Sequence, residues 1–279
     1  MSRLSDGIDP AERFSDRVED YARYRPGYPR ELIETLRTDC GLNEGAAIAD
    51  MGCGTGNLAV IFLENGNTVF GVEPNAAMRE ACRKAMQRFH RFHQIGGRAE
   101  ATGLRTASVD FVVAGQAFHW FEPAATREEF RRILKAGGWV ALVWNERGGG
   151  PSAFLDAYEA ILLRHGTDYR KIRESRGDEA SIMAFFQGEG VRRATFTHAQ
   201  RFDFDGLKGR LLSSSYAPLA GHPAHEPMIG ELREAFDRYQ KDGCVQFPYE
   251  TTMWYGRLGK KHEEGRRAHE WRGRPGPPH

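Results

Sequence analysis

Residues 48–57 read IADMGCGTGN, and this stretch decides the fold class. Its apolar opening is typical of a buried strand, and the glycines at 52, 54 and 56 permit a tight turn into a following helix. A glycine has no Cβ, so it also lets a ligand approach the backbone closely. A tight turn without any ligand explains the same pattern, and the loop alone leaves both interpretations open.

Around this loop, strand-like and helix-like segments alternate. The alternation covers about 100 residues and predicts a parallel sheet with helices on both faces, an α/β doubly wound fold. Two later strand-like segments alternate apolar and polar residues, which favours an antiparallel pair at one edge of the sheet. The expected strands are 46–51, 67–73, 92–98, 109–115, 138–145, 193–204 and 245–258, and the expected helices include 57–64, 75–88, 126–136, 152–165 and 225–241.

Composition excludes several classes of protein. The 279 residues carry 39 Lys and Arg against 38 Asp and Glu, a net charge of +1, so the chain lacks the basic field of a dedicated nucleic-acid binder. Its four cysteines form no CxxC pair, which predicts no metal cluster and fits a reducing cytoplasm. The N-terminus has no apolar signal-peptide core, and no run of 18 apolar residues predicts a membrane span.

Three regions are expected along the chain. Residues 1–38 form an N-terminal helical segment interrupted by RPGYP at 25–29, and residues 39–258 form the main domain. Residues 259–279 have almost no apolar content and predict a disordered tail, whose basic residues are better explained as solvated than as a binding site. Oligomeric state cannot be inferred from these patterns.

The chemistry of the glycine loop narrows the choice of ligand. Gly54-x-Gly56-x-x-Ala59 satisfies the loose dinucleotide pattern, so an NAD-dependent oxidoreductase is one alternative. However, Asp50 would place a negative charge beside a pyrophosphate, and the loop has no basic residue. A carboxylate in a glycine-rich loop suits a cation, such as the sulfonium and ammonium groups of S-adenosyl-L-methionine. Glu73, at the end of the next strand, is placed to accept hydrogen bonds from both ribose hydroxyls.

The order of these motifs resembles class I S-adenosylmethionine-dependent methyltransferases, within the group that acts on small molecules and includes trans-aconitate and quinone-precursor methyltransferases. The resemblance covers residues 10–258 and rests on IADMGCGTG, GVEPNAAM, GRAEATGLRTASVDFVVAGQAFHWF and LKAGGWVALVWNE. It implies a Rossmann-like seven-stranded sheet, mostly parallel with one antiparallel edge strand, and helical cap insertions near 152–190 and 205–225. It further implies methyl transfer by in-line displacement to a small-molecule acceptor whose identity it does not specify.

The same resemblance implies a set of cofactor-binding residues. The N-terminal segment would close as a lid over the methionine end, with Arg25 as partner of its carboxylate. Arg98 departs from the family, where an acidic residue accepts the adenine amino group, so adenine recognition is expected to use the backbone around Ala99 and Glu100. The full expected set is Tyr24, Arg25, Asp50, Gly52, Cys53, Gly54, Thr55, Gly56, Glu73, Pro74, Met78, Ala99, Glu100, Gly115 and Gln116.

His119, in QAFHWF at 116–121, is the candidate catalytic residue. The segment follows the fourth strand, at the edge where open α/β sheets bind ligands. An imidazole there can remove a proton from the acceptor, although a histidine that orients the loop explains the same placement. Trp120 and Phe121 are candidates for an aromatic wall near the sulfonium, and Tyr216 for a contact with the acceptor.

Two further functions remain as alternatives. A nucleic-acid methyltransferase is disfavoured because QAFHWF contains no base-flipping motif of the N/D-P-P-Y/F type. A protein that binds S-adenosylmethionine without turnover would carry the same motifs and would differ only in producing no S-adenosylhomocysteine.

Overall fold

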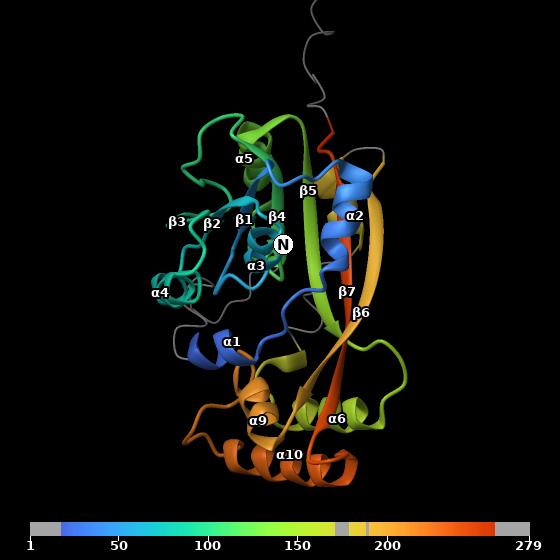
Figure 1. The fold of residues 1–279 in the computed structure, drawn as a ribbon. Helices are drawn as coiled ribbons and strands as arrows, with labels where there is room; N and C mark the ends of the chain where they lie inside the picture. Colours follow the sequence, from blue (N-terminus) through green and yellow to red (C-terminus); the bar gives the residue numbers. More distant parts are fainter. Residues whose placement is uncertain (1–17, 171–178, 188–189, 260–279) are drawn as a thin grey trace, which may run out of the picture.

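The computed structural model describes residues 18–170, 179–187 and 190–259. One seven-stranded sheet with the order β3-β2-β1-β4-β5-β7-β6 organises the chain (Figure 1). The strands are β1 (Ala47–Met51), β2 (Thr68–Val72), β3 (Phe92–Ile95), β4 (Val109–Gly115), β5 (Leu134–Arg147), β6 (Arg192–Phe202) and β7 (Val245–Gly256).

The strand order creates the crevice in which such sheets bind ligands. Strands β3, β2, β1, β4 and β5 pair in parallel, and the chain reverses its direction of progress between β1 and β4. At such a switch point the connections from neighbouring strands leave toward opposite faces and open a crevice at the carboxyl ends. The fold class predicted from the sequence is therefore confirmed.

One detail of the predicted sheet differs. The single antiparallel strand was expected at the edge of the sheet. It is β7, which runs antiparallel to both β5 and β6 and lies second from the edge. The burial of β7 fits this position, because residues 251–255, which pair with both β5 and β6, are all buried. In contrast, β6 alternates exposed and half-buried residues along nearly its whole length, as an edge strand does.

The helices begin and end where the sequence offers caps. Asn75, Ser152 and Asp203 each accept a backbone N–H in the first turn of the helix that follows, and Gly41 ends α2 in a left-handed conformation. The helices are α1 (Val18–Tyr24), α2 (Glu31–Cys40), α3 (Ala59–Glu64), α4 (Ala76–Ala85), η2 (Phe118–Trp120), α5 (Pro123–Ile133), α6 (Ala153–His165), α8 (Glu179–Phe186), α9 (Phe204–Leu212) and α10 (His225–Tyr239).

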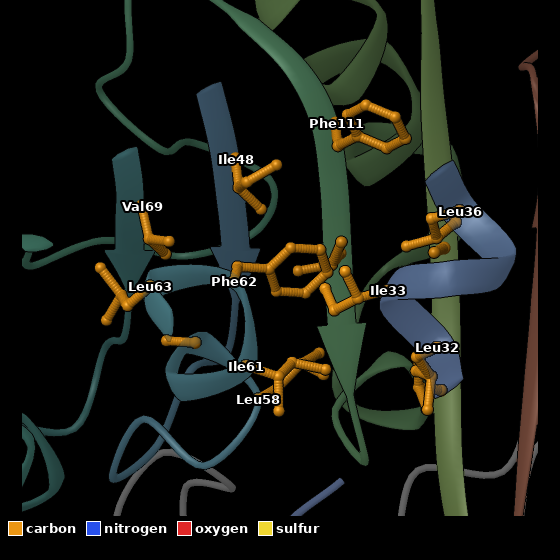
Figure 2. Close-up of a cluster of buried hydrophobic side chains, with 14 of the residues drawn as sticks. Leu32, Ile33, Leu36, Ile48, Leu58, Ile61, Phe62, Leu63, Val69 and Phe111 are labelled. Carbon is orange, nitrogen blue, oxygen red and sulfur yellow. The ribbon is translucent and has the colours of Figure 1, made fainter. Parts of the chain in front are cut away.

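Hydrophobic clusters on both faces fix the sheet against its helices. Figure 2 shows one of them, in which side chains of α2 and α3 pack over β1, β2 and β4. Among these, Ile48, Phe62 and Leu36 are at most 1% exposed, so the strand that leads into the glycine loop is held rigidly.

A third cluster lies beyond the carboxyl ends of β1 and β4. It joins α6, α9 and α10 to the extended ends of β6 and β7, and α1 lies beside α9 (Figure 1). Of these helices, α1 and α9 contribute side chains to the cavity at the strand ends. The division of the chain into lid, main domain and tail stays a prediction, and the proposed tail beyond Gly259 lies outside the described residues. Within the described parts, no helix combines the length and apolar character needed to cross a bilayer.

Candidate functional site

A cavity of about 240 Å³ lies at the carboxyl ends of the parallel strands. Residues after β1, β2, β3, β4 and β5 line its floor, and residues of α1, α9 and the loop after α9 close it. A smaller cavity of about 50 Å³ adjoins it beneath the glycine loop, and the two share lining residues that include Tyr21, Arg25 and Gly54. Segments distant in sequence therefore meet in one continuous site.

The glycines of the loop serve different purposes. Gly52 has φ +64° and packs so tightly that an added Cβ would lie 2.7 Å from Cβ of Ala117. Gly54 has φ +56°, and a Cβ there would point into the cavity, with Cε1 of Tyr21 as its nearest neighbour at 4.0 Å. Gly52 is thus required for packing, whereas Gly54 keeps the space open for a ligand.

Glu73 forms the link between the loop and the second strand. Its Oε2 accepts the N–H of Gly54 at 2.9 Å, and its Oε1 accepts the N–H of Asn75 at 2.9 Å. Burial raises the pKa of this carboxyl, and the two backbone N–H groups oppose the rise. Each oxygen keeps a second lone pair, so the carboxylate is oriented to accept two hydroxyl groups from the cavity.

Asp50 lies at the end of β1 in the smaller cavity and is 1% exposed. Neither of its oxygens has a hydrogen-bond partner within the described structure. Burial, and then the nearby charge of Glu73, raise its pKa to about 8, while the N–H of Ala59 lies near enough to oppose this in part. A buried carboxylate without a partner is costly, and a cationic group beside it would remove that cost.

One wall of the larger cavity is formed by residues after β2 and β3. Met78 and Ala99 are each 4% exposed, and their apolar atoms suit the faces of a flat ring. Oε1 of Glu100 accepts the N–H of Glu122 at 2.8 Å, which holds the loop before α5 against this wall. Arg98 also lines the cavity, in the place where the resemblance leads one to expect an acid.

Gly115 and Gln116 form the floor after β4. An added Cβ at Gly115 would lie 2.5 Å from Oη of Tyr28, so a larger residue there would displace that side chain. Gln116 has φ +56°, an uncommon conformation for a residue other than glycine, and its Nε2 donates to the carbonyl oxygen of Asn145 at 2.5 Å. Backbone strain of this kind is concentrated at functional sites.

The N-terminal segment reaches the cavity through Tyr21 and Arg25, which are one helical turn apart. The guanidinium of Arg25 lies over the ring of Tyr21 at 4.9 Å and donates to the carbonyl oxygen of Ser213 at 3.1 Å. Tyr24 points elsewhere: an added Cβ at Gly209 of α9 would lie 2.1 Å from its ring. Tyr24 therefore anchors α1 to α9 and is not among the residues that line either cavity.

The remaining expected residues lie around the two cavities. Gly56 packs against Met86 and Cys82 instead of facing the space, because its added Cβ would lie 2.8 Å from Cε of Met86. His119 is exposed at the rim, with its ring 4.6 Å from that of Trp120. The larger cavity is lined by Arg25, Gly52, Gly54, Glu73, Pro74, Met78, Ala99, Glu100, Gly115, Gln116, His119, Trp120, Phe121 and Tyr216, and the smaller adds Asp50, Cys53 and Thr55.

Comparison with known proteins decides the family. The sequence profile of the methyltransferase domain family matches residues 49–142. An uncharacterized methyltransferase of Schizosaccharomyces pombe is 33% identical over 247 residues, which cover 86% of this chain and 95% of the relative. The chain belongs to the class I S-adenosylmethionine-dependent methyltransferases. A second, methyltransferase-like protein of the same yeast is 32% identical and covers 90% of this methyltransferase and 97% of its own length.

A solved structure supports the fold. A phosphoethanolamine N-methyltransferase of Haemonchus contortus, determined with phosphomonomethylethanolamine and S-adenosylhomocysteine, aligns with the methyltransferase at a TM-score of 0.53 and 13% identity. The alignment covers 93% of this chain and 61% of that protein. At this identity the likeness concerns the fold alone.

Sequence reasoning missed several polar residues of the methyltransferase's cavity, among them Asn145, Arg147, Arg210 and Tyr249. Asn145 and Arg147 lie at the end of β5. The rule that places ligands at the carboxyl ends of parallel strands, which points to residues at the ends of β2 and β4, applies to them as well. Arg210 lies in α9 between the buried Leu207 and Leu211, where a charged residue on an apolar face is a detectable anomaly. Tyr249 gave no signal, because it continues the apolar face of β7.

His119→Ala is expected to lower the turnover of the methyltransferase roughly 100-fold, the lower end of general-base effects, since the side chain is exposed to solvent. The affinity for S-adenosylmethionine should stay within about twofold, because His119 is not among the residues predicted to bind the cofactor. Formation of S-adenosylhomocysteine and isothermal titration measure the two quantities separately. An unchanged turnover would assign His119 to the orientation of the loop instead.

Proposed function

We propose that this methyltransferase holds S-adenosylmethionine along Asp50, Gly54 and Glu73 and transfers its methyl group to a small-molecule acceptor. The observation that carries the proposal is the continuity of the larger cavity. Gly54 and Glu73 line it together with Arg147 and Tyr216, so a cofactor and an acceptor can meet in the same cavity.

The residues present fit the cofactor. Asp50 offers two buried oxygens without partners to the cationic groups, and Gly54 leaves its side-chain position free. Glu73 would accept the ribose hydroxyls, and Met78 with Ala99 would enclose adenine. Arg25 would pair with the methionine carboxylate, since its Nε has no hydrogen-bond partner among the described residues. A protein of the same fold, from Haemonchus contortus, was solved with S-adenosylhomocysteine, which is consistent with this assignment.

The protein contributes alignment and desolvation to the reaction. When bound, S-adenosylmethionine supplies an electrophilic methyl carbon: the acceptor's lone pair bonds to it while the carbon–sulfur bond breaks and its electrons stay on sulfur. Tyr21 and Arg25 close the cavity from the N-terminal side and exclude water, and His119 at the rim would accept a proton from an acceptor that carries one. We propose no role for a metal ion, nucleic acid or membrane in this step.

The alternatives differ in what they demand of the site. A dinucleotide would bring its pyrophosphate toward the buried Asp50, an unfavourable pairing unless the carboxyl stays protonated. A nucleic-acid substrate would need a basic surface, and the basic tail lies outside the described residues. All four cysteines are free thiols in the structure, which supports the proposed cytoplasmic location.

Isothermal titration with S-adenosylmethionine, S-adenosylhomocysteine and NAD(H) tests the proposal. We expect saturable binding of the first two at one site per chain and no heat from NAD(H). Tight binding of NAD(H) without binding of the sulfonium compound would reject the proposed function. Binding without S-adenosylhomocysteine formation across a broad panel of acceptors would instead favour the non-catalytic alternative.

A further inference from the structure

Three guanidinium groups gather around the larger cavity. Arg25, Arg147 and Arg210 all line it and come from three different parts of the chain. Arg210 is 4% exposed, the side chain of Arg147 is 12% exposed, and Arg25 is half-buried. A buried cation is costly unless an anion balances it, so the partners of these groups decide what the site needs.

Within the described structure, a carboxylate balances only one of the three charges. Nη2 of Arg147 lies 2.9 Å from Oε2 of Glu159. Among the residues that the structure describes, neither Arg25 nor Arg210 has a carboxylate within 4 Å. Burial lowers the pKa of Arg25, and the positive charge of Arg210 lowers it further. Two like charges thus face the larger cavity, and no described carboxylate lies within 4 Å of either. Asp50 lines only the smaller cavity, which Arg25 and Arg210 also reach.

Neutral groups hold Arg210 in a fixed orientation. Its Nε donates to Oη of Tyr249 at 2.9 Å and its Nη1 to Oγ of Ser214 at 3.2 Å, while the guanidinium lies 5.5 Å from the ring centre of Phe247. Tyr249 in turn donates to Oε1 of Gln200 at 2.9 Å. Nη2 of Arg210 has no hydrogen bond to any described residue, so a preorganised donor is left for a ligand.

The pKa of Tyr216 reflects the positive charge that surrounds its hydroxyl group. Its hydroxyl accepts Nη1 of Arg147 at 2.9 Å. Burial alone would raise the pKa of Tyr216, but the charges of Arg147, Arg210 and Arg25 outweigh burial and lower it to about 7. A field that favours a phenolate this strongly also favours any other anion brought to the same place.

We propose that Arg210 and Arg147, with Tyr216, form an anion subsite for the methyl acceptor, and that the acceptor is therefore a small organic acid that binds through a carboxylate. This inference rests on the proposed function, in which the methionine carboxylate occupies Arg25. The charges then match, because one of the two unbalanced guanidinium groups meets the cofactor and the other meets the acceptor. A neutral acceptor would leave the buried charge of Arg210 unbalanced.

The test compares small carboxylic acids with their own primary amides, which have nearly the same shape but no charge. Succinate, citrate, benzoate and 4-hydroxybenzoate, each against its amide, are added at equal concentration to the full chain saturated with S-adenosylhomocysteine. At least one acid is expected to raise the melting temperature while its amide does not. In turnover assays with S-adenosylmethionine, kcat/KM for an acid should exceed that for its amide roughly tenfold or more.

Variants of Arg210 test whether this residue causes the acid-dependent rise in melting temperature. Arg210→Gln should abolish the acid-dependent rise in melting temperature and leave the dissociation constant of S-adenosylmethionine within about twofold. Arg210→Lys, which keeps the charge without the planar fork, should retain part of the rise. Arg201→Gln makes the same change on the exposed face of β6, outside both cavities, and should behave as the unaltered chain.

Each outcome decides the inference. Equal effects of acids and amides, or no stabilisation by any acid of the panel, overturn the anion subsite even if S-adenosylmethionine binds. If Arg210→Gln weakens the binding of S-adenosylmethionine instead, Arg210 holds the methionine carboxylate and the inference is wrong. If the variants do not fold, the comparison of acids with amides on the unaltered chain still decides. Failure of the proposed function is separate, because it appears as absent binding of S-adenosylmethionine in the unaltered chain.

Discussion

Glu73→Ala is expected to weaken the binding of S-adenosylmethionine by roughly 1–3 kcal/mol, which is about a 5- to 150-fold rise in the dissociation constant. The substitution would remove the two charge-assisted hydrogen bonds to the ribose that the proposed function assigns to Glu73. It also releases the N–H groups of Gly54 and Asn75, which the carboxylate now holds at 2.9 Å each. Isothermal titration measures the change directly.

Two further variants separate these contributions. Glu73→Gln keeps the size of the side chain, but its amide nitrogen would face a backbone N–H, so we expect a loss close to that of Glu73→Ala. Glu234→Ala removes an exposed carboxylate of α10 and should leave the affinity unchanged. If Glu73→Ala binds the cofactor as well as the unaltered chain, Glu73 does not belong to the site.

Asp50→Asn is expected to weaken cofactor binding and, at the same time, to stabilise the cofactor-free protein at alkaline pH. The affinity should fall roughly 10- to 100-fold, since the cationic groups lose the buried carboxylate that faces them. The amide remains neutral at every pH, so the free protein no longer has to bury an unpaired charge. The carboxylate of Asp50 is therefore expected to favour cofactor binding and to lower the stability of the cofactor-free protein.

The direction of the pH effect follows from the pKa of Asp50, about 8 in the folded protein against an ordinary 3.8. Between these values the folded state holds a proton that the unfolded state has lost, so stability falls as the pH rises from about 4 to 8. Asp50→Asn lacks this decline, and its advantage in unfolding free energy should grow over the same range, with an upper bound on the order of 5 kcal/mol. Denaturant unfolding of both proteins across the range checks this.

A calorimetric signature accompanies the effect. A cation placed beside Asp50 lowers its pKa, so cofactor binding near neutral pH should release a proton from the unaltered chain and none from Asp50→Asn. Titrations in buffers with different ionisation enthalpies measure the proton count. Equal counts for the two proteins would mean that Asp50 is not the cation partner.

The parts of the site that follow single strands could be predicted from the sequence. The glycine loop and Glu73 follow β1 and β2 directly, and parallel strands bring their carboxyl ends to one edge, so local pattern and topology suffice. The fold class followed from the same alternation. The place of β7 between β5 and β6 did not, because pairing partners of strands far apart in sequence depend on tertiary packing.

The group of arginines proposed to bind the acceptor could not be predicted as a whole. Arg25, Arg147 and Arg210 are more than 60 residues apart at their closest, and only the packing of α1 and α9 over the strand ends brings them together. Tyr24 shows that a residue predicted to line the site can be used for packing elsewhere. Its place three residues after Tyr21 is compatible with a lid, yet the absent side chain of Gly209 offers it a packing site on α9 instead.

A crystal structure of the full chain with S-adenosylhomocysteine would show directly how the cofactor lies. We expect the adenosyl group across Gly54, with both ribose hydroxyls on Glu73 and the amino group of the homocysteine moiety beside Asp50. Density for the ligand at another place, or a glycine loop whose cavity is filled by protein atoms when the ligand is present, would contradict this expectation.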